Sequence, residues 1–383
     1  MQQPIYLDYN ASTPLAAEVS ECMLDLIRGF HGNPSSSHYF GQAARSVVEK
    51  ARAEVAGLLC CTKSEIIFTS GGTESNNLAI LGAVRAAAGQ GNHVICSAVE
   101  HPSVRQVCVH LSELGYDVTV LQVDGSGLVD PDELLQSIGP GTVLVSVMHA
   151  NNEVGTVQPV RELAAVAAES GVLFHTDAAQ SAGKIDVSAT GADMISLAGH
   201  KVYGPKGTGV LYVKEGVDLR NHMHGAGHER GLRPGTENVI GIAGMGVACR
   251  IAGMNLGRTG THMMNMRDRL HSRLSTLIGA ENIRLNGHPD RRLPNTLSLG
   301  FRGVRADGLM RELRDVVALS AGAACHGEGI SLSPVLEAMR VPLEWAAGTI
   351  RFSTGRGTTP EEIDDASTAV AESVRRLRDR GPE

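Results

Sequence analysis

Short apolar runs rich in β-branched residues alternate with longer amphipathic stretches up to about residue 255. The short runs are typical of strands, and several of them end in glycine or polar residues. We predict strands at Ile66–Thr69, His93–Ser97, Val118–Gln122, Val143–Met148, Val172–Thr176, Met194–Ala198 and Gly209–Val213. Helices are predicted between them, among them Gln42–Leu59, Ser75–Ala88 and Val160–Ser170. This alternation favours an α/β fold with a mostly parallel sheet.

The pattern changes after about residue 255. Predicted helices at Thr261–Leu277 and Ala306–Leu313 now alternate with strand-like runs at Asn295–Gly300 and Thr349–Ser353. A last helix begins with Thr359 as N-cap, Pro360 at the first helical position and a capping-box glutamate at Glu362. Apolar residues then recur at helical spacing, at Ile363, Ala366, Val370, Val374 and Leu377. We therefore predict a second, smaller α+β domain.

Composition and charge narrow the class of protein. The chain has 383 residues, which suits two or three domains, and 42% hydrophobic with 20% charged residues is typical of a soluble globular protein. A net charge of −7 argues against nucleic acid as the main partner. We find no apolar stretch of about 18 residues and no secretory signal at the N-terminus, so no membrane association is expected. The seven cysteines include no pair with zinc-ligand spacing, so we expect reduced thiols, a cytoplasmic location and no metal site.

Two charged residues stand where apolar runs end. Lys201 follows Ile195–Ala198 in a Gly-His-Lys step before a glycine-rich turn, a place where a lysine can be desolvated and become a nucleophile for carbonyls. Asp177 ends the run that starts at Val172, where a buried carboxylate needs a cationic partner such as a protonated pyridine nitrogen. The alternatives are a solvent-exposed turn lysine and an N-cap aspartate.

Further candidates lie in the neighbouring turns. Gly71-Gly72-Thr73 joins a strand to a helix and would form a phosphate cradle, or an ordinary capped turn. His101 lies beyond a strand end and would stack on an aromatic cofactor and move protons, or be a surface histidine. Asn151 would bind a phenolic oxygen or a carboxylate, or simply shape an Asn-rich turn.

Three residues in the second half of the chain extend this set. Thr236, in a compact polar loop, would bind a phosphate or belong to a surface loop. Arg351, in a strand-like run, would grip an α-carboxylate or lie in solvent. Cys325 lies among glycines and alanines with His326 beside it, unlike the other six cysteines, which we interpret as small core residues. A nucleophilic lysine, a buried carboxylate and a thiol on a flexible loop together indicate pyridoxal phosphate chemistry on a sulfur amino acid.

These motifs, in this order, closely resemble those of the cysteine desulfurases in the class V aminotransferase family, a group that includes selenocysteine lyases. The matching segments span nearly the whole chain: Tyr6–Pro14, Gly32–Ser36, Ser70–Ser75, Glu100-His101, Ala150–Glu153, His175–Gln180, Gly199–Lys201, Arg233–Glu237, the Cys325 loop and Ile350–Ser353. The resemblance implies a homodimer of the pyridoxal phosphate fold-type I class. It also implies a large cofactor-binding domain at 15–255 with a seven-stranded sheet, and a small domain formed by 1–14 with 256–383.

The resemblance also implies roles for individual residues. Lys201 would form a Schiff base with the cofactor, Asp177 would pair with its ring nitrogen, and His101 would stack on the ring. Gln180 would contact the phenolate oxygen. The phosphate would be bound by Gly72, Thr73, His200 and Thr236, the last from the partner subunit. The substrate carboxylate would be held by Asn33, Asn151 and Arg351, and Cys325 would take the sulfur.

The expected reaction converts L-cysteine to L-alanine and leaves a persulfide on Cys325 for a sulfur acceptor protein. The alternative within the family is a selenocysteine lyase acting on L-selenocysteine, with selenium passed to an acceptor. Ala198 replaces a serine that many housekeeping desulfurases carry, and Ala323-Ala-Cys-His326 looks like the lyases. Pro102, where selenium-specific animal enzymes have an aspartate, looks like the desulfurases. A transaminase or other lyase that uses Lys201 without Cys325, and a non-catalytic scaffold for sulfur carriers, are the remaining alternatives.

Overall fold

The computed structural model describes residues 3–326 and 329–380, with side chains described outside 323–331. A seven-stranded sheet forms one half of the molecule, in the order β2-β8-β7-β6-β5-β3-β4. The strands are β2 (Ile66–Thr69), β3 (His93–Ser97), β4 (Asp117–Leu121), β5 (Thr142–Ser146), β6 (Leu173–Asp177), β7 (Met194–Ala198) and β8 (Gly209–Val213). The five strands β7, β6, β5, β3 and β4 run parallel to one another. Strand β8 runs antiparallel to both of its neighbours, β2 and β7. The predicted α/β class and mostly parallel sheet are confirmed.

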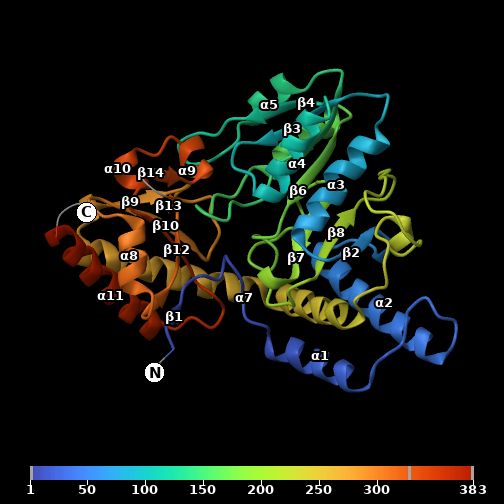
Figure 1. Cartoon of the computed structure of the whole chain (residues 1–383), viewed down its shortest axis with the longest axis horizontal. Helices are drawn as coiled ribbons and strands as arrows, with labels where there is room; N and C mark the ends of the chain where they lie inside the picture. The colour runs from blue at the N-terminus through green and yellow to red at the C-terminus, as the bar shows by residue number, and fades with distance from the viewer. Residues whose placement is uncertain (1–2, 327–328, 381–383) are drawn as a thin grey trace.

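The central strands are apolar throughout because helices cover both faces of the sheet. All five residues of β7 are buried. Alternate residues face opposite layers: Ile195 and Leu197 pack with α2 (Tyr39–Leu59), α6 (Val160–Glu169) and the start of α7 (Val239–Ile278). Met194 faces the other layer, formed by α3 (Gly72–Ala86) and α4 (Pro102–Glu113). Helices α1 (Ala17–Gly29) and α5 (Pro131–Ser137) complete this half (Figure 1).

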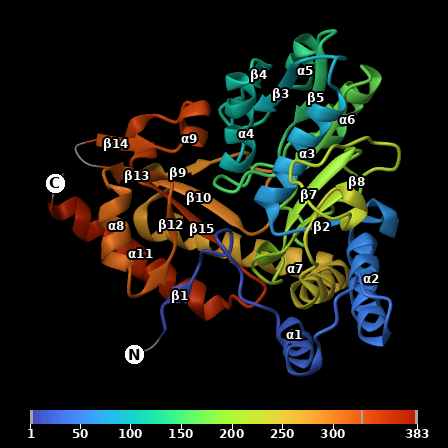
Figure 2. The ribbon, with the colours of Figure 1, turned by 45° about the vertical axis from the view of Figure 1, so that its right-hand side comes forward.

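A four-stranded antiparallel sheet forms the other half, in the order β12-β15-β10-β9. Its strands are β9 (Ile283–Asn286), β10 (Thr296–Phe301), β12 (Ser320–Ala321) and β15 (Thr349–Ser353). Helices α8 (Ala306–Leu313) and α11 (Pro360–Arg380) pack on it (Figure 2). The short helices α9 (Pro334–Ala338) and α10 (Leu343–Ala346) lie beside it (Figure 1). The N-terminal segment joins this half, since β1 (Ile5–Tyr6) pairs with β11 (Val317–Ala318) and Leu7 is buried in its core.

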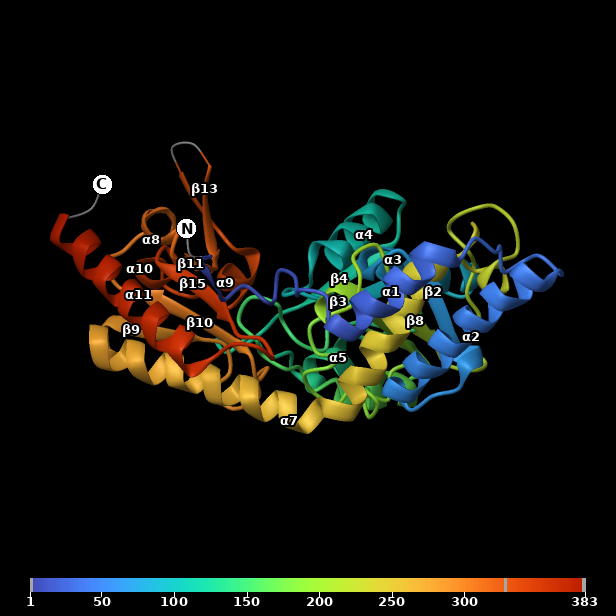
Figure 3. The same cartoon turned by 90° about the horizontal axis from the view of Figure 1, so that it is seen from below.

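Helix α7 runs along the underside of both halves (Figure 3). Its first part packs closely on α2, where a Cβ added at Gly246 would lie 2.6 Å from the Cα of Ala51. Its second part contributes Leu270 and Leu274 to the core around the smaller sheet. Because one helix crosses residue 255, the boundary between the two domains stays a prediction.

The expectation that no stretch is long and apolar enough to cross a bilayer is wrong for α7. This 40-residue helix contains an 18-residue window with a mean hydropathy of 1.5. Its apolar residues have another explanation, because 56% of that window is buried inside the molecule, against α2 and the large sheet. Buried core helices of soluble proteins are apolar all round for the same reason.

Candidate active site

A cavity of about 300 Å³ opens at the carboxyl ends of β6 and β7, where open α/β sheets bind their ligands. The large half supplies most of its wall, and Arg351 reaches in from β15 of the smaller sheet. The N-terminal segment crosses its edge with Asn10 and Ala11. The structure thus brings together eight of the predicted site residues: Gly72, Thr73, His101, Asp177, Gln180, His200, Lys201 and Arg351.

Lys201 ends a 3-10 turn, η2 (Gly199–Lys201), directly after β7. The turn folds back so tightly that a Cβ at Gly199 would lie 2.7 Å from the carbonyl oxygen of Pro205. The Lys201 amine donates hydrogen bonds to the carbonyl oxygens of Asn10 and Ala11. Burial, with help from the charge of Arg351, lowers the pKa of Lys201 to about 8. The amine is therefore uncharged more often than a solvent lysine at neutral pH, as carbonyl chemistry requires.

Asp177 is the last residue of β6 and is only 6% exposed. Its Oδ1 accepts a hydrogen bond from the Ala179 backbone at 2.9 Å, and its Oδ2 accepts one from the Asn76 amide at 2.7 Å. No helix begins here; the carboxylate closes a turn instead. A buried carboxylate held by neutral donors and facing a cavity is suited to a cationic ligand atom.

His101 is the N-cap of α4 and uses its Nδ1 to accept from the Ser103 backbone at 3.2 Å. The Ser103 hydroxyl lies 2.7 Å from the same nitrogen. Desolvation by the surrounding protein and the charge of Lys201 lower the pKa of His101, against the opposing effect of Asp177. These effects favour the neutral form of the ring, and His101 is exposed.

The start of α3 forms the other end of the cavity. Strand β8 approaches it so closely that a Cβ at Gly209 would lie 2.5 Å from the Gly71 carbonyl carbon. Gly72 and Thr73 line the cavity beside Ala198 and His200. Desolvation, then Lys201 and Lys206, lower the pKa of His200 to about 4, so it is a neutral donor. A helix N-terminus with glycine and threonine is suited to a phosphate group.

Arg351 is held in place by partners on three segments. Its Nη2 lies 2.7 Å from Asp8 Oδ1 and 2.9 Å from Ser320 Oγ. Its Nη1 donates to the backbone oxygen of Asn152 at 3.1 Å. The solvent-exposed alternative is thus wrong, because this guanidinium faces the cavity.

Three predicted residues do not line the cavity in a single chain. Asn151 is fully buried, and its amide donates to Val99 O at 3.0 Å while its Oδ1 accepts from the backbone of Glu153 and Val154. The neighbouring Asn152 lines the cavity instead. Asn33 and Thr236 lie in exposed loops away from it. Their assigned roles stay predictions.

Sequence reasoning missed several residues that the fold brings to the site. Asn10 bridges the two halves: its Oδ1 accepts from Asn295 at 2.9 Å, and its carbonyl accepts from Gln180 at 3.0 Å. Lys184 is 6% exposed and donates to Gln180 Oε1 at 3.0 Å. Burial lowers its pKa to about 7. The buried position of Lys184 could have been suspected from the apolar residues around it, but its partner could not.

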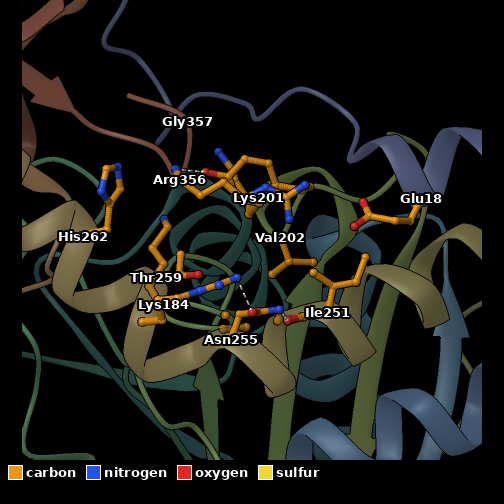
Figure 4. A pocket seen from close by; sticks show the side chains of 15 residues that line it. Glu18, Lys184, Lys201, Val202, Ile251, Asn255, Thr259, His262, Arg356 and Gly357 are labelled. Carbon is orange, nitrogen blue, oxygen red and sulfur yellow. Dashed lines mark hydrogen bonds between the residues drawn. The ribbon is translucent and has the colours of Figure 1, made fainter. Parts of the chain in front are cut away.

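Lys201 also borders a second cavity of about 540 Å³ on the side of α7. Figure 4 shows Lys184 and Lys201 with Asn255, His262 and Arg356 around this space. The Arg356 guanidinium lies over the Tyr203 ring, 4.2 Å from its centre. The reactive amine therefore stands between two chambers, and only the smaller one contains Asp177 and the start of α3.

Cys325 lies on a β-hairpin rather than in an irregular loop. Strand β13 (Ala323–His326) pairs antiparallel with β14 (Gly329–Leu332), and Cys325 stands opposite Ile330. The turn at 327–328 and the side chains of 323–331, including the Cys325 thiol, lie outside the described residues. Its approach to the cavity stays a prediction.

The residues around the smaller cavity fit pyridoxal phosphate. The cofactor has a phosphate, a basic ring nitrogen, a phenolic oxygen and an aldehyde, and the cavity offers a matching group for each. These are the α3 N-terminus, Asp177, Gln180 and the Lys201 amine. Among the described residues no group of three or more His, Cys, Asp or Glu side chains could hold a metal ion.

Comparisons with known proteins agree with this site. A family model described as "Aminotransferase class-V" matches residues 5–365. "Cysteine desulfurase IscS" from Dictyoglomus turgidum is 41% identical over 385 residues, which is 100% of this chain and 97% of the relative. The protein of the same name from Vibrio vulnificus strain CMCP6 is 43% identical over 389 residues, or 100% and 95% of the two chains.

Solved structures are similar over nearly the full length. A "NifS-like protein" superposes with a TM-score of 0.90 at 36% identity, covering 97% of this chain and 99% of that one. "SspA in complex with cysteine" gives a TM-score of 0.78 at 35% identity, covering 94% and 100%. The fold, the site and the sequence therefore point to one group of proteins.

Proposed function

The chain belongs to the class-V aminotransferase family, and on that premise we propose that it is a pyridoxal phosphate-dependent cysteine desulfurase. It converts L-cysteine to L-alanine and takes the sulfur as a persulfide on Cys325. The observation that carries this proposal is that one cavity is lined by the desolvated Lys201, the buried Asp177 and the inward-facing Arg351. Full-length relatives named as cysteine desulfurases support the same activity.

The cofactor is assigned to the smaller cavity. Lys201 would attach it covalently, Asp177 would keep a proton on the ring nitrogen, and Gln180 would donate to the phenolic oxygen. Gly72, Thr73 and His200 would hold the phosphate at the start of α3. When bound, pyridoxal phosphate supplies an electron sink for the pair left when Cα loses its proton.

The chain's own residues then position the substrate and move its protons. Arg351 binds the α-carboxylate, and because it already pairs with Asp8 at 2.7 Å, the substrate shares or displaces that contact. The Lys201 amine takes the proton from Cα, which its lowered pKa favours. The Cys325 sulfur forms a bond to the substrate sulfur, while the bond between that sulfur and Cβ breaks. The electron pair of the broken bond goes to the carbon skeleton, which is protonated and leaves as alanine.

A homodimer completes the site in this proposal. Thr236 and Asn33 are exposed and lie away from the cavity of their own chain. A second copy would bring Thr236 of the partner subunit to the phosphate. The persulfide is then passed to a sulfur acceptor protein, and the six described cysteines, all unpaired, support a reducing cytoplasmic setting.

L-Selenocysteine is the second candidate substrate, and Ala198 favours it. This residue lines the cavity beside Gly72, at the place where a serine hydroxyl would contact the phosphate. If the enzyme is a selenocysteine lyase, it releases selenium from L-selenocysteine although the cofactor phosphate lacks that serine contact.

A paired assay tests the proposed function. The purified, cofactor-loaded protein is given L-cysteine or L-selenocysteine, and alanine is measured as the common product. We expect alanine from cysteine in step with sulfur transferred to a thiol acceptor. Negligible alanine from cysteine together with rapid alanine formation from selenocysteine would overturn the desulfurase proposal in favour of a lyase.

A further inference from the structure

A continuous hydrogen-bonded path links Asp177 to His101. Asp177 Oδ2 accepts from Asn76 Nδ2 at 2.7 Å, and the same amide nitrogen lies 2.8 Å from Ser103 Oγ. The Ser103 hydroxyl lies 2.7 Å from His101 Nδ1. Asn76 is fully buried and Ser103 is 8% exposed, so water has little access to the two contacts of the Asn76 amide nitrogen. The path joins β6, α3 and α4, three elements that meet at the cavity.

The donor and acceptor of each hydrogen bond along this path can be assigned, starting from the Asn76 amide. The Asn76 amide nitrogen carries two protons, and both are used, one on Asp177 and one on Ser103. The reverse orientation of the amide would place its oxygen against the Asp177 carboxylate, so the charge on Asp177 fixes the amide. Since Ser103 Oγ accepts from Asn76, its own proton is free to point at His101 Nδ1.

The second donor to His101 settles which ring nitrogen carries the proton. The Ser103 backbone N–H also points at Nδ1, at 3.2 Å. A nitrogen that accepts from both a backbone N–H and a hydroxyl carries no proton of its own. The proton of the neutral ring therefore lies on Nε2, and protonation of Nδ1 would cost both contacts.

We propose that Ser103 and Asn76 are positioning residues that hold His101 neutral, with its proton on Nε2, and tie that state to the charge on Asp177. This proposal rests on the proposed function and assigns different roles to His101 and Lys201 within it. A neutral ring with Nδ1 blocked donates a hydrogen bond from Nε2 but takes no proton there. The Cα proton is therefore left to Lys201, and His101 acts as a fixed donor.

The charged and titratable groups around His101 are compatible with this assignment. Asp177 on β6 favours the cationic ring, whereas Lys201 on η2 opposes it. Glu100 precedes His101, and burial raises its pKa to about 8, so much of it is uncharged at neutral pH. A further pocket beside the start of α4 is lined by both His101 and His110.

Nitrogen NMR of the apoenzyme tests the proposal without any catalysis. The protein is labelled with ¹⁵N-histidine, and the His101 signals are assigned by their loss in His101→Gln. We expect the wild-type ring to show the Nε2–H tautomer and to titrate below the usual histidine range. In Ser103→Ala the neutral form loses one donor to Nδ1, so the His101 pKa rises and the Nδ1–H tautomer becomes populated.

Three further variants separate positioning from folding. Asn76→Ala frees the Ser103 hydroxyl to rotate and is expected to shift His101 in the same direction. Ser103→Thr keeps the hydroxyl and should preserve the wild-type spectrum. Ser112→Ala, at an exposed site on the same helix, should change nothing. An Nδ1–H tautomer in the wild-type protein, or a His101 signal unmoved by both Ser103→Ala and Asn76→Ala, would overturn the proposal.

The loaded enzyme gives an independent readout. Ser103→Ala should lower kcat for cysteine by no more than about tenfold, the scale of one hydrogen bond, and shift the acid limb of the pH profile upward. An unchanged acid limb would contradict the proposal. Because the NMR test needs no turnover, failure of the positioning role and failure of the desulfurase function are seen separately.

Discussion

Replacing Lys201 with alanine is expected to lower alanine formation from L-cysteine by roughly 10³-fold or more. The amine has two roles in this account, covalent attachment of the cofactor and removal of the Cα proton. No other described lysine lines the cavity that contains Asp177 and the start of α3. Alanine production, followed by amino-acid analysis at saturating cofactor, measures the loss.

Two controls make this result specific. Lys214→Ala removes a half-exposed lysine that directly follows β8 and pairs with Asp193 at 3.1 Å, and this change should leave activity unchanged. Circular dichroism should show that Lys201→Ala retains the native secondary structure. Retention of more than about a tenth of wild-type activity by the folded Lys201→Ala variant would contradict both roles of the amine.

Replacing Cys325 with alanine is expected to abolish persulfide formation and to lower alanine formation from cysteine by roughly 10³-fold. The substrate sulfur then has no thiolate to attack it, while Arg351 still binds the carboxylate. Mass spectrometry of the Cys325 peptide after brief incubation with cysteine should show one added sulfur atom in the wild-type enzyme and no sulfur on any peptide of the variant.

Cys60 provides the matched control for this experiment. It is an exposed free cysteine outside the site, so Cys60→Ala should keep both the persulfide on Cys325 and full turnover. Undiminished alanine formation by Cys325→Ala would mean that sulfur leaves cysteine without an enzyme thiol. The protein would then be a lyase of another kind that uses Lys201 alone.

The strands of the large sheet were predictable because their burial on both faces leaves a plain apolar signal. All seven lie within two residues of the predicted bounds. Helix α7 was predicted only over 261–277 although it begins at Val239. Its N-terminal part contains Gly241, Gly244 and Gly246, which weaken helix propensity. Tertiary packing outweighs this loss, since Gly246 lets α2 approach closely and Gly244 lies against Met23 of α1.

Site residues at strand ends were predictable for a geometric reason. Parallel strands end at one edge of the sheet, so Asp177 at the end of β6 and Lys201 shortly after β7 had to lie close together. Asn151 and Asn152 show the limit of such reasoning. They are neighbours in one turn, yet the Asn151 side chain shapes the turn whereas Asn152 lines the cavity. The contacts of Asn76 with Asp177 join residues 101 positions apart and depend on how α3 packs on the sheet.

Arg351 and Asp8 illustrate the same limit at the seam between the two halves. Each lies in a segment recognisable on its own, but their ion pair spans 343 positions and closes the cavity with the N-terminal segment. Neither hydrophobic periodicity nor local motifs contain information on such a contact. The pairing of β1 with β11 and of Asp8 with Ser353 helps to place the segment there, together with contacts such as that of Thr13 with His200.

Borohydride reduction of the loaded enzyme tests the central claim most directly. The reagent would fix the cofactor to the lysine that bears it, and peptide mass spectrometry would identify that lysine. We expect one cofactor per chain, on Lys201. A cofactor fixed to the neighbouring Lys184, whose amine is also desolvated, or no fixed cofactor at all, would contradict it.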